Sequence, residues 1–205
     1  MKSFPGQIPI FPLSGVIYFP QTNLPLNIFE QRYLDMINDT IRKDKLMGMV
    51  QSKKESGSVY QVGCLGKISD YQKSKDGRIL INLTGISRFK ILEEISNDKL
   101  YREFKVDYKD FNEDSTETKN LVDTKLLMDS AKKFFKRNGL LLNWKEFEKL
   151  DQSQKINTLA MIAPITNEEK QKLLESISLK NKVETLESII SFYLHETNFN
   201  NQTVQ

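Results

Sequence analysis

The sequence contains little cysteine, little histidine and no long hydrophobic run. Its 205 residues include one cysteine, Cys64, and one histidine, His195. A single cysteine forms no intramolecular disulfide, which is typical of a protein from a reducing compartment. The same two counts exclude a zinc site built from Cys and His ligands within this chain. We therefore expect no disulfide, no metal site and no cofactor.

No segment approaches the roughly 18 consecutive apolar residues that a membrane-spanning helix needs. Pro5, Pro9 and Pro12 interrupt the apolar residues near the N-terminus, which is not the pattern of a secretory leader. The 30 basic and 27 acidic residues leave a net charge of +3 and are interspersed. They form no concentrated basic stripe of the kind that nucleic-acid-binding proteins carry. These features predict a protein of the cytoplasm, or of some other intracellular compartment, without a membrane partner.

The first half of the chain alternates apolar and polar residues in the manner of β-strands. Asp76-Gly77, between two such segments, is a strong signal for a tight hairpin. Glycines inside strand patterns, Gly63, Gly66 and Gly85, indicate bulges or tight bends of a curled sheet. A helix from about 30 to 43 interrupts the β region. Strand candidates lie near residues 8–13, 16–19, 24–29, 46–50, 62–73, 78–86, 89–91 and 104–108.

The second half of the chain has helical patterns, which follow the polar and acidic stretch DFNEDSTETK at residues 110–119. An apolar stripe at helical spacing ends at Asn138-Gly139. Asp151 with Gln154, and Thr166 with Glu169, resemble capping boxes that open two more helices. A last helix begins near Leu179. The stripe of the first helix consists of Leu127, Ala131, Phe134 and Phe135, and Ile156, Leu159, Ala160 and Ala163 are expected to face inward from the second. The apolar residues of the last two helical segments are Leu173, Leu174 and Ile177, followed by Val183, Leu186, Ile190 and Tyr193.

These patterns predict an α+β fold. A small β-barrel or sandwich of six or seven strands, with one inserted helix, precedes a C-terminal helical bundle. We expect a barrel subdomain at residues 1–112, a helical subdomain at 119–197 and a disordered tail at 198–205.

Several candidate chemical sites have a structural explanation that we favour. Gly63-Cys-Leu-Gly66-Lys67 superficially resembles a phosphate-binding loop, but Gln61 and Ile68 stand where the motif needs Gly and Ser or Thr. Cys64 in a strand and His195 near a helix end are typical of structural or surface residues. Lys132, Lys133, Lys136 and Arg137 lie opposite their helix's apolar stripe, so we interpret them as a solvated face rather than a nucleic-acid patch. The residues alone therefore indicate no catalytic site.

Three blocks, in order along the chain, together resemble the N-terminal, substrate-binding domain of Lon ATP-dependent proteases. The blocks are IPIFPLSGVIYFPQTNLPLNIFEQRYLDMI, VGCLGKISDYQKSKDGRILINLTGISRFKI and NTLAMIAPITNEEKQKLLESISLKNKVETLESII. The residues that carry the resemblance are Pro12, Leu13, Pro20, Leu24, Pro25, Leu26, Phe29, Glu30, Arg32 and Tyr33 in the first block, Gly63, Gly77, Gly85, Arg88 and Phe89 in the second, and Lys170, Gln171, Leu173 and Leu174 in the third.

The resemblance implies a PUA-like β-barrel followed by a helical subdomain. It also implies recognition of unfolded or tagged protein segments, whereas the family's ATP hydrolysis and proteolysis belong to separate AAA+ and Ser–Lys protease domains. The sequence has no Walker motif and no protease domain, so it resembles the stand-alone members of the family, and we expect no enzyme activity. The expected partners are unfolded or extended polypeptide and a separate ATP-dependent protease, which would make the chain an adaptor in protein quality control.

Two other functions stay open at this point. PUA-like barrels also serve RNA-modifying proteins, so RNA binding is the main alternative. A hydrolase with an unrecognised site ranks third.

The stretch LPLNIFEQRYLDMI at residues 24–37 holds most of the candidate peptide-binding residues. We expect Glu30 in the first helical turn, where a carboxylate complements the helix dipole, and Tyr33 fastening the helix to the barrel. Arg32 could pair near Glu30 or with another strand, or face a ligand, and we favour a structural role over contact with a ligand. The candidate peptide-binding residues are Phe29, Arg32, Tyr33 and Arg88.

Overall fold

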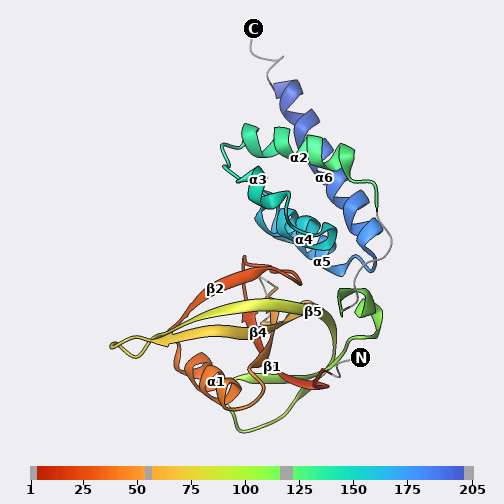
Figure 1. Ribbon diagram of the computed structural model, residues 1–205. Helices are drawn as coiled ribbons and strands as arrows, with labels where there is room; N and C mark the ends of the chain where they lie inside the picture. Colours follow the sequence, from red (N-terminus) through yellow and green to blue (C-terminus); the bar gives the residue numbers. More distant parts are fainter. Residues whose placement is uncertain (1–3, 54–56, 116–121, 201–205) are drawn as a thin grey trace. The chain divides into compact units, whose positions relative to one another are not determined.

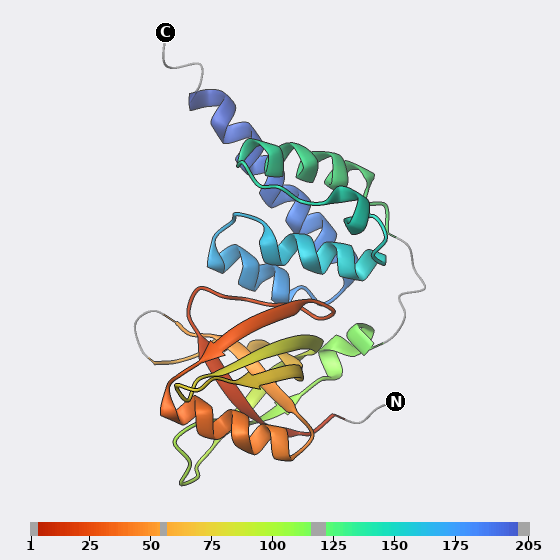
Figure 2. The same ribbon diagram turned by 60° about the vertical axis from the view of Figure 1, so that its left-hand side comes forward.

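The computed structural model describes residues 4–53, 57–115 and 122–200 (Figures 1 and 2). The chain divides into two compact units, Met1–Glu117 and Thr118–Gln205, which we call the barrel unit and the helical unit. Much of the expected boundary, 116–119, lies outside the described residues. The part before it, which the sequence indicated only as a polar linker, forms a 3-10 helix, η1 (Lys109–Ser115).

The barrel unit is a closed, mixed sheet with one inserted helix (Figure 1). The strand order is β2-β5-β4-β3-β1-β6, and a further pairing of β5 with β6 closes the ring. Among the described strands, β1 and β3 pair in parallel and the other pairs are antiparallel. The elements are β1 (Gln7–Leu13), β2 (Asn23–Ile28), α1 (Gln31–Arg42), β3 (Leu46–Gln51), β4 (Val62–Lys73), β5 (Ile79–Ile95) and β6 (Arg102–Asp107).

The sheet closes because β5 is long and irregular. Its first residues, from Ile79, pair with β2, and its last, to Ile95, pair with β6, while β4 runs beside most of its length. The sequence predicted a bend or bulge at Gly66, and the register between β4 and β5 shifts there. Gly85 is required by close approach, because a Cβ at this position would collide with the carbonyl oxygen of Phe19.

A hydrophobic cluster fills the interior of the barrel, and α1 covers part of its outside by burying Tyr33, Met36 and Ile37. The cluster consists of Ile8, Ile10, Val50, Val59, Leu65, Phe89, Ile91, Phe104 and Val106.

Residues 16–19 form no strand, contrary to the expectation, although Ile17, Tyr18 and Phe19 are buried. A local turn holds these residues, in which the Thr22 hydroxyl donates to the Phe19 carbonyl at 2.7 Å.

The helical unit contains α2 (Lys125–Arg137), α3 (Trp144–Phe147), α4 (Gln152–Ile162), α5 (Asn167–Glu175) and α6 (Leu179–Asn200). The predicted caps are present, because Asp151 accepts from the Gln154 amide and Thr166 with Glu169 forms a reciprocal capping box. The apolar stripes of α2 and α4 are buried as expected. The short α3 was not predicted.

Two apolar residues of the predicted helices are not fully buried. Ile177 lies after α5, which ends at Glu175, and its side chain is 64% exposed. Tyr193 is only half-buried. Of the expected disordered tail, residues 198–200 belong to α6, and 201–205 lie outside the described residues.

Candidate functional site

Strand β2 lies at an open edge of the sheet, because among the described strands it pairs with β5 alone. The amide of Gly85 donates to the carbonyl of Thr22 at 2.9 Å. In an antiparallel ladder, every second residue has its N–H and C=O directed at the neighbouring strand, so from Thr22 onward these are Leu24, Leu26 and Ile28. The backbone groups of Asn23, Pro25 and Asn27 therefore point toward the open edge. Pro25 is tolerated there because its missing N–H removes no ladder hydrogen bond.

The outer face of the β2–β5 ladder carries exposed apolar side chains next to a polar network. Phe29, directly after β2, is 66% exposed, and Leu80 is 46% exposed. Leu80 pairs with Asn27, two residues before Phe29. We call Pro25, Phe29 and Leu80 the β2 face. Its polar neighbours hydrogen-bond to one another, and they are Asn23, Ser69, Asn82 and Thr84.

The segment after Phe29 fastens α1 to the barrel. Glu30 is the N-cap rather than a first-turn residue, and its carboxylate makes no capping bond. It accepts instead from Arg32, at 3.1 Å from Nε and 2.8 Å from Nη2. Arg32 thus forms an ion pair with Glu30, which is a structural role as favoured. Both side chains are about half exposed, so this pair contributes only about 0.2–1 kcal/mol to the stability of the fold.

Tyr33 is buried and acts in packing. Its ring meets Phe11 edge-on at 4.3 Å, and the Arg32 guanidinium lies 4.5 Å from the ring centre. Burial raises the pKa of the Tyr33 hydroxyl, while the positive charge of Arg32 lowers it to a lesser degree. Of the three candidates in this segment, Phe29 and Arg32 are accessible to a ligand and Tyr33 is not.

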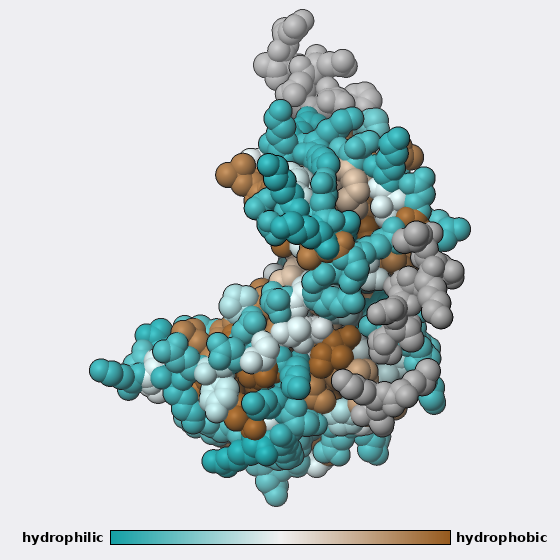
Figure 3. All heavy atoms as spheres, in the orientation of Figure 1, coloured by the Kyte–Doolittle hydropathy of each residue, from teal (hydrophilic) through white to brown (hydrophobic). Residues whose placement is uncertain are grey.

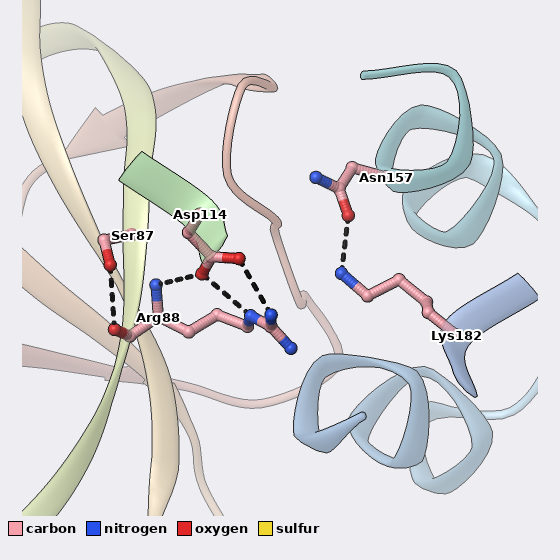
Figure 4. Close-up of polar contacts among 5 residues, drawn as sticks. All are labelled: Ser87, Arg88, Asp114, Asn157 and Lys182. Carbon is pink, nitrogen blue, oxygen red and sulfur yellow. Dashed lines mark hydrogen bonds and ion pairs between the residues drawn. The ribbon is translucent and has the colours of Figure 1, made fainter. Parts of the chain in front are cut away.

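Arg88, the fourth candidate peptide-binding residue, lies in the interior and not on a surface. Its side chain is 2% exposed, and its Nε and Nη2 donate to the Asp114 carboxylate at 2.8 Å each (Figure 4). The guanidinium also lies 4.5 Å from the ring centre of Phe111. Both partners come from η1, within the stretch that the sequence indicated only as a linker, so no local pattern pointed to this pair.

The third block of family residues lies in the helical unit, where it joins helices. Lys170 donates to the carbonyl of Met161 at 2.7 Å, and burial lowers the pKa of its ammonium group. Gln171 is buried and donates to Glu175, while Leu173 and Leu174 are in the core. These positions stabilise the bundle.

Sequence reasoning missed a further polar contact in the bundle. Lys182 on α6 is 2% exposed, and its ammonium group donates to the side-chain oxygen of Asn157 on α4 at 2.7 Å (Figure 4). A buried lysine needs such a partner, because burial without one is costly. Its position in a helix interior offered no sequence signal.

The remaining family residues have architectural positions. Pro12 and Leu13 end β1, Pro20 is buried in the turn before β2, and Leu24 and Leu26 face inward from β2. Gly77 has a φ of 87° at the predicted hairpin, and Phe89 is fully buried. Gly63 lies against β3, where an added Cβ would be 2.6 Å from the Met49 carbonyl oxygen.

A groove of about 290 Å³ runs between α1 and the start of β6. Its lining is mixed, because Pro5, Ile8, Pro9 and Leu46 contribute apolar surface. Two of its polar side chains are paired, since Tyr101 donates to Asp39 at 2.8 Å and Glu103 pairs with Lys99 at 2.9 Å. No cluster of His, Cys, Asp and Glu able to hold a metal ion occurs in the part of the chain that the structure describes. None of the helices in the described ranges is both long and apolar enough to traverse a bilayer.

The fold, a mixed six-stranded sheet followed along the chain by a helical part, is shared by solved structures. The Lon N-terminal domain protein from Xanthomonas campestris matches 88% of this chain and 96% of its own, with a TM-score of 0.67 and 21% identity. The N-terminal domain of Mycobacterium avium complex Lon protease matches 90% of this chain and 98% of its own, with a TM-score of 0.67 and 15% identity.

Residues 7–191 match the family of the ATP-dependent protease La (LON) substrate-binding domain, and the chain belongs to this family. Lon protease 2 of Myxococcus xanthus is 23% identical over 203 residues, which are 93% of this chain and 24% of that protein. The Lon protease of Cytophaga hutchinsonii is 26% identical over 144 residues, 67% of this chain and 18% of that protein. The matched residues therefore make up a quarter or less of the length of these relatives.

Proposed function

We propose that this chain is a non-catalytic recognition module that binds unfolded or extended polypeptide segments on the barrel unit. The observation that carries the proposal is an exposed aromatic side chain, Phe29, at the end of an open edge strand in a Lon substrate-binding domain. An adaptor role, delivering such segments to a separate ATP-dependent protease, is part of the same proposal.

The β2 edge provides the backbone part of the recognition. An extended segment can add to an exposed sheet edge through main-chain hydrogen bonds, which are indifferent to sequence. Asn23 and Asn27 each present an N–H and a carbonyl there, while Pro25 presents a carbonyl alone. The resulting pairing is short, and this suits weak binding of many different segments.

The β2 face provides the side-chain part. Phe29 and Leu80 lie on one face of the ladder, so alternate side chains of an added strand reach them. A large exposed aromatic residue is a typical anchor of an interface. Arg32, one helical turn away and half exposed, can pair with an acidic side chain of the bound segment by exchanging its bond to Glu30.

Fluorescence anisotropy of labelled, unfolded casein tests the proposal. We expect a dissociation constant in the range of roughly ten to a hundred micromolar. Phe29→Ala should weaken binding about fivefold or more, because it removes the aromatic anchor. Leu100→Ala is the matched control, since Leu100 is also 66% exposed in the barrel unit but lies in the β5–β6 connection. No binding at these concentrations contradicts the proposal.

A second variant tests the backbone part separately. Asn27→Pro removes one N–H that points to the open edge and leaves the ladder with β5 intact. We expect it to weaken casein binding while Asn27→Ala does not. Equal affinity of both variants would exclude strand addition at β2.

RNA binding stays a prediction from the sequence. The same assay with a labelled RNA hairpin tests it, because binding to phosphates weakens steeply as salt rises.

A further inference from the structure

The connection between α2 and α3 carries the most exposed leucine of the described residues. Leu141 is 102% exposed, so its side chain projects fully into solvent, and Leu140 is 38% exposed. Leu142 follows, half-buried. Figure 3 shows hydrophobic side chains projecting from the helical unit where α2 ends in Figure 1. We call residues 140–142 the leucine tip.

Two helix caps hold the leucine tip in place. At the end of α2, Gly139 has a φ of 67°, its amide donates to Lys136, and the Leu140 amide donates to Phe135. These two bonds form a Schellman motif, which fixes the direction of the chain. On the other side, Asn143 caps α3. The exposure of the leucines is therefore a built feature of the fold and not the fraying of a long loop.

Basic residues flank the leucine tip on both sides along the chain. Lys133, Lys136 and Arg137 are exposed in the last turns of α2, and Lys145 is exposed in α3. None of these four forms an ion pair with another residue in the described ranges. The nearby carboxylates are already paired, Glu148 with Lys132 at 3.3 Å and Glu146 with Lys149 at 2.7 Å. Between Lys132 and Lys149, the charged side chains without an ion pair are thus all basic.

We propose that the leucine tip is a membrane-contact loop that inserts into the interface of a bilayer containing anionic lipids. A projecting apolar tip forms no pocket for a ligand, but it can insert into the apolar region of a bilayer. A collar of Lys and Arg then lies at the height of the negatively charged headgroups. Trp144 is half-buried, and the Lys132 ammonium lies 5.5 Å from the centre of its ring. Tryptophan is a residue type that is enriched at the interface between a membrane and water. This peripheral contact differs from the sequence expectation of no membrane partner.

Co-sedimentation of the whole chain with vesicles tests the proposal. Vesicles of phosphatidylcholine with about a third phosphatidylglycerol should retain the protein at low salt, and pure phosphatidylcholine vesicles should retain much less. Leu141→Asp should lower binding to anionic vesicles about tenfold, because it places a carboxylate in the inserting tip. Lys133→Glu with Lys136→Glu should lower it to the level of neutral vesicles.

Leu126→Asp is the matched control. Leu126 is also an exposed leucine of the helical unit, 70% exposed, and it lies in the first turn of α2, at the end of that helix away from the leucine tip. Equal circular dichroism spectra of the two Asp variants establish that both fold. The proposal is overturned if the wild-type chain prefers anionic vesicles no more than neutral ones. It is also overturned if Leu126→Asp and Leu141→Asp lose binding equally.

Discussion

Asp114 accepts three hydrogen bonds from Arg88, each of 2.8 Å, from the backbone amide, Nε and Nη2. Both side chains are buried, at 2% and 8% exposure. The two residues are 26 positions apart, and their contact joins the 3-10 helix η1 to strand β5. Arg88, one of the residues that carry the family resemblance, thus stabilises the barrel unit by holding η1 against β5.

Asp114→Ala should destabilise the protein by about 3 kcal/mol, because it leaves the buried Arg88 guanidinium without its compensating charge. Urea denaturation followed by circular dichroism measures this. Asp110→Ala is the control, since Asp110 lies exposed in the same 3-10 helix and should change stability by less than about 0.5 kcal/mol. A double variant, Arg88→Met with Asp114→Leu, should lose less than the sum of the single changes.

Gly85→Ala should lower stability by about 2 kcal/mol or more, because the new Cβ collides with backbone atoms of Phe19 and Pro20. Gly77 provides the comparison, since no atom lies within 4 Å of a Cβ there and the obstacle is only its φ of 87°. Gly77→Asn should therefore be tolerated, because Asn adopts this conformation readily. The melting temperatures of both variants test this prediction. A similar loss of stability in Gly85→Ala and Gly77→Asn would contradict it.

The pair of Glu94 and Arg102 should make stability depend on pH. Hydrogen bonds from Arg102, at 2.7 and 2.6 Å, hold the pKa of the Glu94 carboxyl below its ordinary value. A lowered carboxyl pKa stabilises the folded state above the ordinary value of 4.5, and this contribution is lost as the pH falls through the lower folded value.

The measurement compares wild type with Glu94→Gln in urea denaturation between pH 7 and pH 3. The difference in unfolding free energy should be largest at pH 7 and should shrink below about pH 4.5. Arg102→Met should remove the same pH dependence. A difference that stays constant over this range would show that the pair contributes nothing through ionisation.

The capping box of α5 should contribute about 1 kcal/mol. Thr166 accepts from the Glu169 amide at 3.2 Å, and Glu169 accepts from the Thr166 amide at 2.8 Å. Thr166→Ala removes the acceptor for one orphan amide, whereas Thr166→Ser retains it and should be within a few tenths of wild type. Chemical denaturation of the two variants tests this, and equal losses would mean that the methyl group matters rather than the cap.

Local patterns in the sequence predicted the elements that depend on local contacts. The hairpin at Asp76-Gly77, the box at Thr166 and the apolar stripe of α2 each involve residues a few positions apart, so spacing alone reveals them. The predicted strand at residues 16–19 was wrong for a reason that is also local. Residues 16–19 have a strand-like composition, but a turn closed by Thr22 holds them out of the sheet.

The candidate site could be predicted only in part. The sequence drew attention to Phe29 and Arg32, and both are exposed. It could not separate them from Arg88, which belongs to an equally recognisable motif but is buried. Exposure is set by whatever packs over a residue, and here Asp114 and Phe111 arrive from a segment without any strong pattern of its own.

The sequence by itself determined the family, the division into a β part and a following helical part, the hairpin and the helix caps, because each follows from residue types at short spacing. Only the tertiary structure decided the parallel pairing of β1 with β3, the closure of the barrel through β5, and the burial of Arg88 against Asp114. These depend on contacts between distant parts of the chain, whose choice is made by the packing of the whole core.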